Sequence, residues 1–273
     1  AKTYPFDETS PTDKKTHSFR GLGTAVGTRD EADLQVFMSA TGFKGGVTET
    51  TRIRAYRMWE IINSDPGNIM VEPDFNIQVL QGNTSDISLV SGNFRTGVSA
   101  WIARAMGLPI GNIVLCCNEN SGVWNLFTHG ALRTDGISIP TLTPEADVCI
   151  PDSLERLIYE YGGIPETQLY LEACRKGRSY CPSDLMLSKL RKDLYVSVVS
   201  TNRITALIPS VYKSHGKLLS RATALSYGGL LDYRAKTGST GSAILWSEEG
   251  PVSERTQIAE ILGIPEDTLD ELL

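Results

Sequence analysis

The seven residues Ser91-Gly92-Asn93-Phe94-Arg95-Thr96-Gly97 contain two glycines and an arginine in a stretch that could bind an anion. They follow the apolar run 87–90 and precede a helical pattern over residues 98–106. In a strand, turn and helix of this kind, backbone N–H groups and the positive end of the helix can face a phosphate. The Arg95 guanidinium can add a bidentate grip on phosphate or carboxylate. The loop is therefore a candidate anion-binding or cofactor-binding site.

Arg95 also supports a second interpretation of the loop. Glycine lets a backbone approach a ligand closely, whereas an arginine side chain occupies that space. Arg95 could therefore fill the space at the loop or reach a neighbouring carboxylate. We expect this second interpretation to hold.

Other residues that could do chemistry do not form a recognisable site. The three histidines, His17, His129 and His215, are far apart and lack nearby cysteine or aspartate at ligand spacing. Cys174 and Cys181 have no second cysteine pair near them. We therefore predict no metal site. The odd number of cysteines, five, favours a reducing compartment over a disulfide framework.

Strands and helices alternate from residue 87 onward. The predicted helices cover residues 98–106, 123–130, 153–161, 166–176, 183–193, 204–214 and 223–233, with a further helix from about 253 that ends at Gly263. The predicted strands cover 87–90, 113–117 and 242–246. This alternation predicts an α/β domain over 87–273, with a parallel sheet and flanking helices. We expect residues 1–35 to form an extended N-terminal arm and residues 36–86 to form a distinct mixed α/β segment.

Composition places the chain among globular proteins. Of its 273 residues, 41% are hydrophobic and 21% are charged. The net charge of −6 argues against nucleic-acid binding, which requires clustered lysine and arginine. No run approaches the roughly 18 apolar residues of a membrane span, and the polar residues 1–15 do not resemble a signal peptide. We expect a location in the cytoplasm or in a particle assembled inside the cell.

Ser91-Gly92-Asn93-Phe94 is followed by a small-residue helical pattern and then by the sequence MGLPI at residues 106–110. These segments resemble the serine-glycine-asparagine-phenylalanine-glycine loop of threonine synthases and the MGLPI sequence that follows their helix. Further similar segments occur in the family's order at 118–120, 141–148, 151–157 and 220–227. Threonine synthases are pyridoxal-phosphate (PLP) enzymes of the tryptophan-synthase-β type. The resemblance implies a partial PLP fold type II domain that corresponds to their C-terminal half.

The resemblance also defines which cofactor residues to look for. The family's lysine motif, roughly GPT-AFKD, and its SGDTG segment do not occur in this sequence, and Arg95 replaces the glycine of the phosphate loop. Lys44, between Phe43 and Gly45, is the nearest candidate for a Schiff-base lysine. Ser247 could supply the hydroxyl that faces the pyridine nitrogen. Two carboxylates follow it at 248–249, which is an unfavourable neighbourhood for a phosphate dianion.

Three functions are compatible with these residues. The favoured one is a non-catalytic structural or interaction subunit of a larger assembly, without a cofactor and forming a homo- or hetero-oligomer through the arm 1–35. The second is a PLP-dependent carbon–oxygen lyase or threonine synthase-like enzyme, or a cofactor-binding subunit, that uses Lys44 or a lysine from another chain. The third is a regulatory module that binds a small anion. The sequence leaves open whether the protein is an enzyme.

Overall fold

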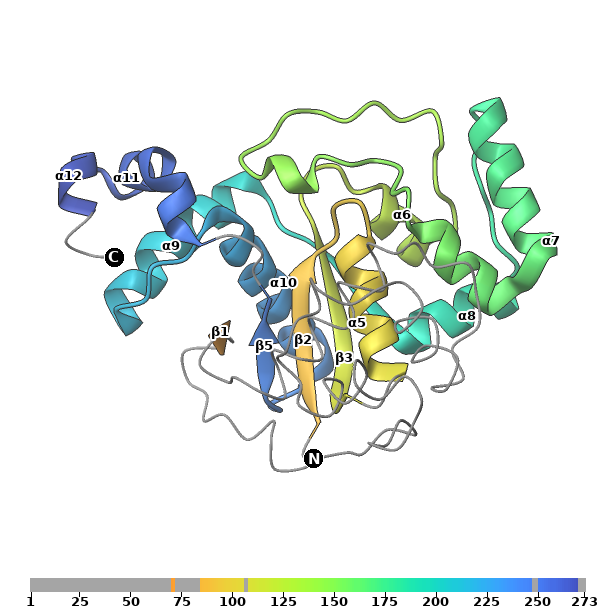
Figure 1. Cartoon of the computed structure of the whole chain (residues 1–273), viewed down its shortest axis with the longest axis horizontal. Helices are drawn as coiled ribbons and strands as arrows, with labels where there is room; N and C mark the ends of the chain where they lie inside the picture. The colour runs from red at the N-terminus through yellow and green to blue at the C-terminus, as the bar shows by residue number, and fades with distance from the viewer. Residues whose placement is uncertain (1–69, 72–83, 106–107, 247–249, 270–273) are drawn as a thin grey trace, which may run out of the picture.

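The computed structural model describes residues 70–71, 84–105, 108–246 and 250–269 (Figure 1). The helices and strands occur in this order: β1 (Met70–Val71), β2 (Ser85–Val90), α5 (Arg95–Ala105), β3 (Ile110–Cys117), α6 (Gly122–His129), η4 (Pro144–Ala146), α7 (Leu154–Lys176), α8 (Asp184–Asp193), β4 (Leu194–Val198), α9 (Thr201–His215), α10 (Arg221–Thr237), β5 (Ala243–Leu245), η5 (Pro251–Glu254), α11 (Arg255–Leu262) and α12 (Glu266–Leu269).

The strands form one sheet in the order β1-β5-β2-β3-β4. β5, β2, β3 and β4 are parallel, and β1 is antiparallel to β5. This arrangement confirms the predicted parallel sheet with flanking helices. β1 belongs to the predicted segment 36–86, so two residues of that segment lie at the edge of the sheet. The arm 1–35, most of 36–86 and Lys44 lie outside the described residues.

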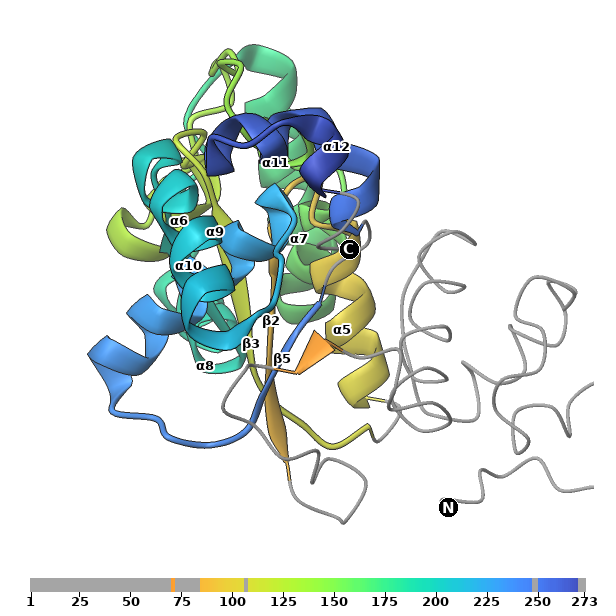
Figure 2. The same cartoon turned by 90° about the vertical axis from the view of Figure 1, so that its left-hand side faces the viewer.

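Alternating strand residues form two separate cores on the two faces of the sheet. Ile87, Leu89, Ile113 and Leu115 pack with the buried residues of α5, α6, α7 and α8. Their neighbours in the strands, Val114 and Cys116 among them, pack with α9, α10 and α11. Figure 2 shows α5 and α10 on opposite sides of the strands. Because both faces are covered, the strands consist largely of apolar residues.

Most predicted helices are confirmed within a few residues, and one strand differs from the prediction. The predicted helices 153–161 and 166–176 both lie in α7, where non-helical torsion angles at Gly163 (φ 66°, ψ −164°) form a kink between them. The strand β4 is absent from the prediction. It follows α8 without an intervening turn, because Leu194 is both the C-cap of α8 and the first residue of β4. No glycine or proline therefore marks the boundary.

Helix α10 lies very close to the sheet because it presents glycines to it. A Cβ atom at Gly229 would lie 2.2 Å from the Cys116 Sγ, and one at Gly228 would lie 2.7 Å from a Val199 methyl group. Ser226 also faces this interface, and its carbonyl accepts a hydrogen bond of 2.7 Å from the Ser88 hydroxyl. The Ser226 hydroxyl itself is buried without a hydrogen-bond partner among the described residues.

Two serine-to-alanine changes at this interface should therefore have opposite effects. Ser226→Ala removes an unsatisfied buried hydroxyl and raises helix propensity, so we expect the free energy of unfolding to rise by about 1 kcal/mol. Ser88→Ala removes the donor to the Ser226 carbonyl, so we expect a decrease of about 1 kcal/mol. Urea denaturation of both variants measures the difference. A loss of stability in Ser226→Ala would show that its hydroxyl has a partner.

Candidate functional site

The β2–α5 loop lies at the point where the connections of the sheet reverse direction. From β2 the chain passes through α5 to β3 and then to β4. It returns through α9 and α10, on the other face, to β5, which pairs with the opposite side of β2. In open parallel sheets, ligands bind beside the carboxyl ends of the strands at such a switch point. The topology therefore places the predicted loop at the site where a ligand is expected.

The loop is a tight turn between β2 and α5. The Ser91 N–H donates to the Cys116 carbonyl at 2.9 Å, which extends the sheet by one residue, and the Phe94 N–H turns back to the Ser91 carbonyl at 2.7 Å. Phe94 has a positive φ of 66°, which is unusual for a non-glycine residue. Its ring is fully buried, and its carbonyl accepts the Val98 N–H in the first turn of α5. Burial of the ring offsets the backbone strain.

The seven loop residues have different environments. Arg95 is exposed, Asn93 and Thr96 are half-buried, and Ser91, Gly92, Phe94 and Gly97 are buried. Gly97 faces the sheet, where a Cβ atom would lie 2.8 Å from a Leu115 methyl group. Ser91 is held by its backbone, because its N–H donates to the Cys116 carbonyl and its carbonyl accepts the Phe94 N–H. Gly97 and Ser91 thus have structural contacts, and Arg95 is the loop side chain that solvent reaches most freely.

Arg95 is the residue on which the two interpretations of the loop differ. Its side chain is exposed and does not fill a buried space. Within the described residues it forms no ion pair with a carboxylate. The N–H groups of Gly92 and Asn93 likewise have no acceptor in the described part of the chain. The loop therefore has one exposed guanidinium and two backbone donors without an acceptor among the described residues.

A second segment, residues 139–153, packs on this loop. The carbonyl oxygen of Glu145 in η4 would lie 2.5 Å from a Cβ atom at Gly92, whose φ is +38°. Residue 92 must therefore be glycine for two reasons, its backbone conformation and this close contact. Asn93 binds the same segment further on, at Asp152.

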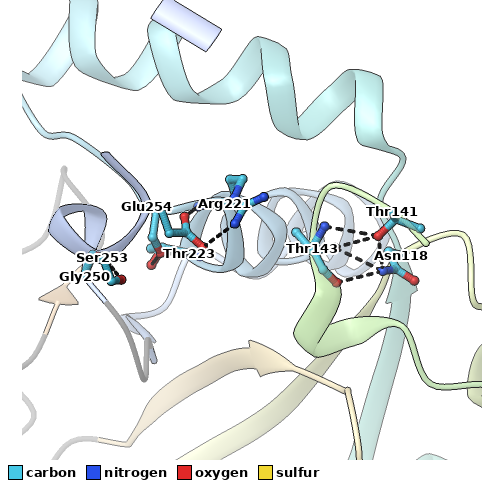
Figure 3. Close-up of polar contacts among 9 residues, drawn as sticks. Asn118, Thr141, Thr143, Arg221, Thr223, Gly250, Ser253 and Glu254 are labelled. Atoms are coloured by element: carbon cyan, nitrogen blue, oxygen red, sulfur yellow. Dashed lines mark hydrogen bonds and ion pairs between the residues drawn. The ribbon is translucent and has the colours of Figure 1, made fainter. Parts of the chain in front are cut away.

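The segment is in turn fixed by a polar network at the carboxyl end of β3. Asp147 accepts hydrogen bonds from the side chains of Asn118 (2.7 Å), Asn120 (3.0 Å) and Thr141 (2.7 Å) and from the Thr141 N–H (2.9 Å). Asn118 is fully buried and also donates to Thr143 (Figure 3). These residues were not among the site residues predicted from the sequence. The sequence did contain one indication of this network, since Asn118 and Asn120 follow the end of the predicted strand 113–117.

The residues that follow β5 are anchored at the start of α10. Glu254 is buried and accepts a hydrogen bond of 2.8 Å from the Arg221 N–H. Its other carboxylate oxygen lies 3.3 Å from the Arg221 guanidinium (Figure 3). A carboxylate is favourable at a helix N-terminus. Ser247, the predicted partner of a pyridine nitrogen, lies between β5 and this anchor, outside the described residues.

The adjacent cysteines of β3, Cys116 and Cys117, are buried, which makes their thiols poor nucleophiles. Burial raises the pKa of Cys116 to about 12 and that of Cys117 to about 11. Both thiols therefore stay protonated at neutral pH, and a thiol is much less nucleophilic than a thiolate. Among the described residues, no group of three histidine, cysteine or acidic side chains could hold a metal ion. None of the described helices is long and apolar enough to cross a membrane.

Comparison with known proteins relates the chain to one group of enzymes. No family model matches. Threonine synthase from Pseudomonas aeruginosa is 27% identical over 140 residues, which cover 50% of this chain and 30% of that protein. Threonine synthase from Methylobacillus glycogenes is 33% identical over 89 residues, or 31% of this chain and 19% of the relative. Human threonine synthase-like 1 is 25% identical over 150 residues, or 53% of this chain and 20% of the relative. In each case the matched residues cover less than a third of the length of the relative.

Solved structures extend the similarity to most of the chain. A crystal structure of PLP-bound threonine synthase from Brucella melitensis superposes with a TM-score of 0.64 at 19% identity, covering 84% of this chain and 47% of that one. Threonine synthase from yeast gives 0.60 at 18% identity, covering 79% and 43%. The chain is thus similar to threonine synthases in sequence over about half its length and in fold over most of it.

Proposed function

We propose that this protein binds a phosphate-bearing small molecule at the carboxyl end of β2, and that PLP is the first ligand to test. The observation that carries the proposal is the exposed Arg95 guanidinium at the first residue of α5, which has no carboxylate partner in the described part of the chain. The N–H groups of Gly92 and Asn93, without acceptors among the described residues, lie beside it in the chain. Guanidinium and backbone N–H groups are the donors that proteins use for phosphate.

The donors of this loop fit the phosphate of PLP, and the proposal goes no further than binding. PLP, when bound, supplies an electron sink for reactions at amino-acid carbons. The nearest candidate for a Schiff-base lysine, Lys44, and the candidate partner of the pyridine nitrogen, Ser247, lie outside the described residues. The relative from Brucella melitensis binds PLP, which supports testing the same ligand here.

Arginine at position 95 changes how the phosphate is held. A glycine would leave the contact to backbone N–H groups, whereas Arg95 adds a positive charge and up to two further hydrogen bonds. Because the guanidinium is exposed, solvent and salt screen its attraction for the ligand. We therefore expect affinity for phosphate and PLP to fall as ionic strength rises.

Arg95→Ala should raise the dissociation constant for PLP about tenfold, which corresponds to one exposed charge-assisted interaction. Arg95→Lys should recover part of the loss, because lysine keeps the charge and loses the bidentate geometry. Isothermal titration calorimetry with PLP and with inorganic phosphate measures both effects. Arg178→Ala is the matched control, since it removes an exposed arginine just after α7 and should leave affinity unchanged.

The titrations with phosphate and PLP also distinguish among the three functions that are compatible with the sequence. If the unmodified chain binds neither phosphate nor PLP, the proposal fails, and the expected role as a non-catalytic structural or interaction subunit is the one to test by measuring oligomeric state. If PLP binds and borohydride fixes it to a lysine, the lyase alternative gains support. Binding without such fixation supports the regulatory, small-anion-binding alternative.

A further inference from the structure

The side chain of Asn93 is fully engaged with another part of the chain. Its Oδ1 accepts the Asp152 N–H at 2.8 Å, and its Nδ2 donates to the Asp152 carboxylate at 3.1 Å. The Asn93 carbonyl also accepts the Ser153 N–H at 3.3 Å. These three hydrogen bonds join the β2–α5 loop to Asp152, which lies 59 positions later, and to Ser153, the next residue, directly before α7.

The same loop is held at a second point. Gly92 lies against the Glu145 carbonyl, and η4, which contains Glu145, ends directly before Asp147. Hydrogen bonds from Asn118 and Thr141 hold Asp147 at the end of β3. Gly92 and Asn93, whose N–H groups have no acceptor among the described residues, are thus both held by segment 144–153, and neither is held by local turn contacts alone.

These contacts from segment 144–153 are important because the backbone of the loop is strained. Phe94 keeps a positive φ of 66°, which persists only where surrounding contacts impose it. An anion site built from backbone donors binds well when those donors are oriented before the ligand arrives, because little entropy is then lost in ordering them on binding.

We propose that Asn93 and Asp152 are positioning residues of the anion site, so that segment 144–153 determines its affinity together with the loop itself. This inference rests on the proposed function. Asn93 would then orient the Gly92 and Asn93 N–H groups without its side chain contacting the ligand. Asp152 would act through Asn93 as a hydrogen-bond acceptor.

Electrostatics gives the opposite expectation, which makes the proposal testable. Asp152 is an exposed carboxylate beside an anion site, and by charge alone its removal should strengthen anion binding. The positioning role predicts that removing its acceptor weakens binding. Asp152→Ala and Asp152→Asn both remove the charge, and only the asparagine keeps an oxygen that can accept from Asn93 Nδ2. The difference between these two variants isolates the hydrogen bond.

The test uses the full 273-residue chain, with PLP and inorganic phosphate as probes in titration calorimetry. We expect a dissociation constant about fivefold higher for Asp152→Ala than for Asp152→Asn, as for the loss of one hydrogen bond. Asn93→Ala, which removes both side-chain bonds, should weaken binding at least as much as Asp152→Ala. An Asp152→Ala variant that binds as tightly as Asp152→Asn, or more tightly, overturns the proposal.

Hydrogen exchange without ligand separates this proposal from the proposed function. The amides of Phe94 and Ser153, which donate to the Ser91 and Asn93 carbonyls, should exchange several-fold faster in Asp152→Ala than in Asp152→Asn or the parent, because local opening becomes easier. If the parent binds no anion, the proposed function fails while this measurement still tests the Asn93–Asp152 contact. Equal exchange rates in all three proteins overturn the positioning role whether or not a ligand binds.

Discussion

Replacing Gly229 with alanine should lower the free energy of unfolding by about 3 kcal/mol. The new methyl group would lie 2.2 Å from the Cys116 Sγ and 3.1 Å from its Cβ, in a fully buried interface between α10 and β3. Overpacking of this kind typically costs about 1–3 kcal/mol. Alanine otherwise favours a helix interior over glycine by about 1 kcal/mol, so the expected sign is opposite to that of helix propensity. Chemical denaturation measures the change.

A second substitution identifies the contact responsible. Cys116→Ala removes the Sγ atom, so the double variant Cys116→Ala/Gly229→Ala should be more stable than the sum of the two single changes predicts by about 1–2 kcal/mol. Gly250→Ala is the control, because a Cβ atom added at residue 250 would have no described atom within 4 Å and the φ there is −86°. Additive effects in the double variant would contradict the close approach of α10 to β3.

Asp147→Ala should also destabilise the protein by about 3 kcal/mol. The change removes the acceptor of four hydrogen bonds from Asn118, Asn120 and Thr141. Asn118 is fully buried and Asn120 nearly so, and buried donors that lose a charged acceptor stay desolvated without a compensating hydrogen bond. Other acceptors, such as the Ile139 carbonyl near Asn120, limit the loss. The measurement is again the free energy of unfolding.

Two further variants show whether the network is the cause. Asp147→Asn keeps one acceptor oxygen and places an amide among donors, so it should cost an intermediate amount. Asp135→Ala removes an exposed carboxylate whose described side-chain partner is the exposed Arg133, and it should change stability by less than about 0.5 kcal/mol. Equal losses in Asp147→Ala and Asp135→Ala would show that the network contributes nothing specific.

The order of most elements and the location of the candidate loop could be predicted from the residues alone. Apolar runs, small-residue turns and helix-ending glycines act within a few residues, so they can be recognised without knowing the fold. The predicted end of the terminal helix at Gly263 is confirmed, since Gly263 is its C-cap with φ 68°. The parallel sheet followed from the alternation of strands and helices.

β4 shows the limit of this local reasoning. The run Leu194–Val198 directly continues α8, and nothing in its own residues separates a short buried strand from the last turn of a helix. It is a strand because it pairs with β3, from Leu194 opposite Ile113 to Val198 opposite Cys117. That pairing depends on a strand that lies far earlier in the chain.

The construction of the candidate site depends on tertiary contacts. The exposure of Arg95, the contact of Gly92 with Glu145 and the pairing of Asn93 with Asp152 all depend on segment 139–153 folding back onto the β2–α5 loop. Residues of one short loop thus have different roles in the fold. Gly97 packs against the sheet, whereas Arg95 faces solvent. The physical reason is that side-chain type determines what a residue can bind, whereas its partner is determined by which distant segment the fold brings to it.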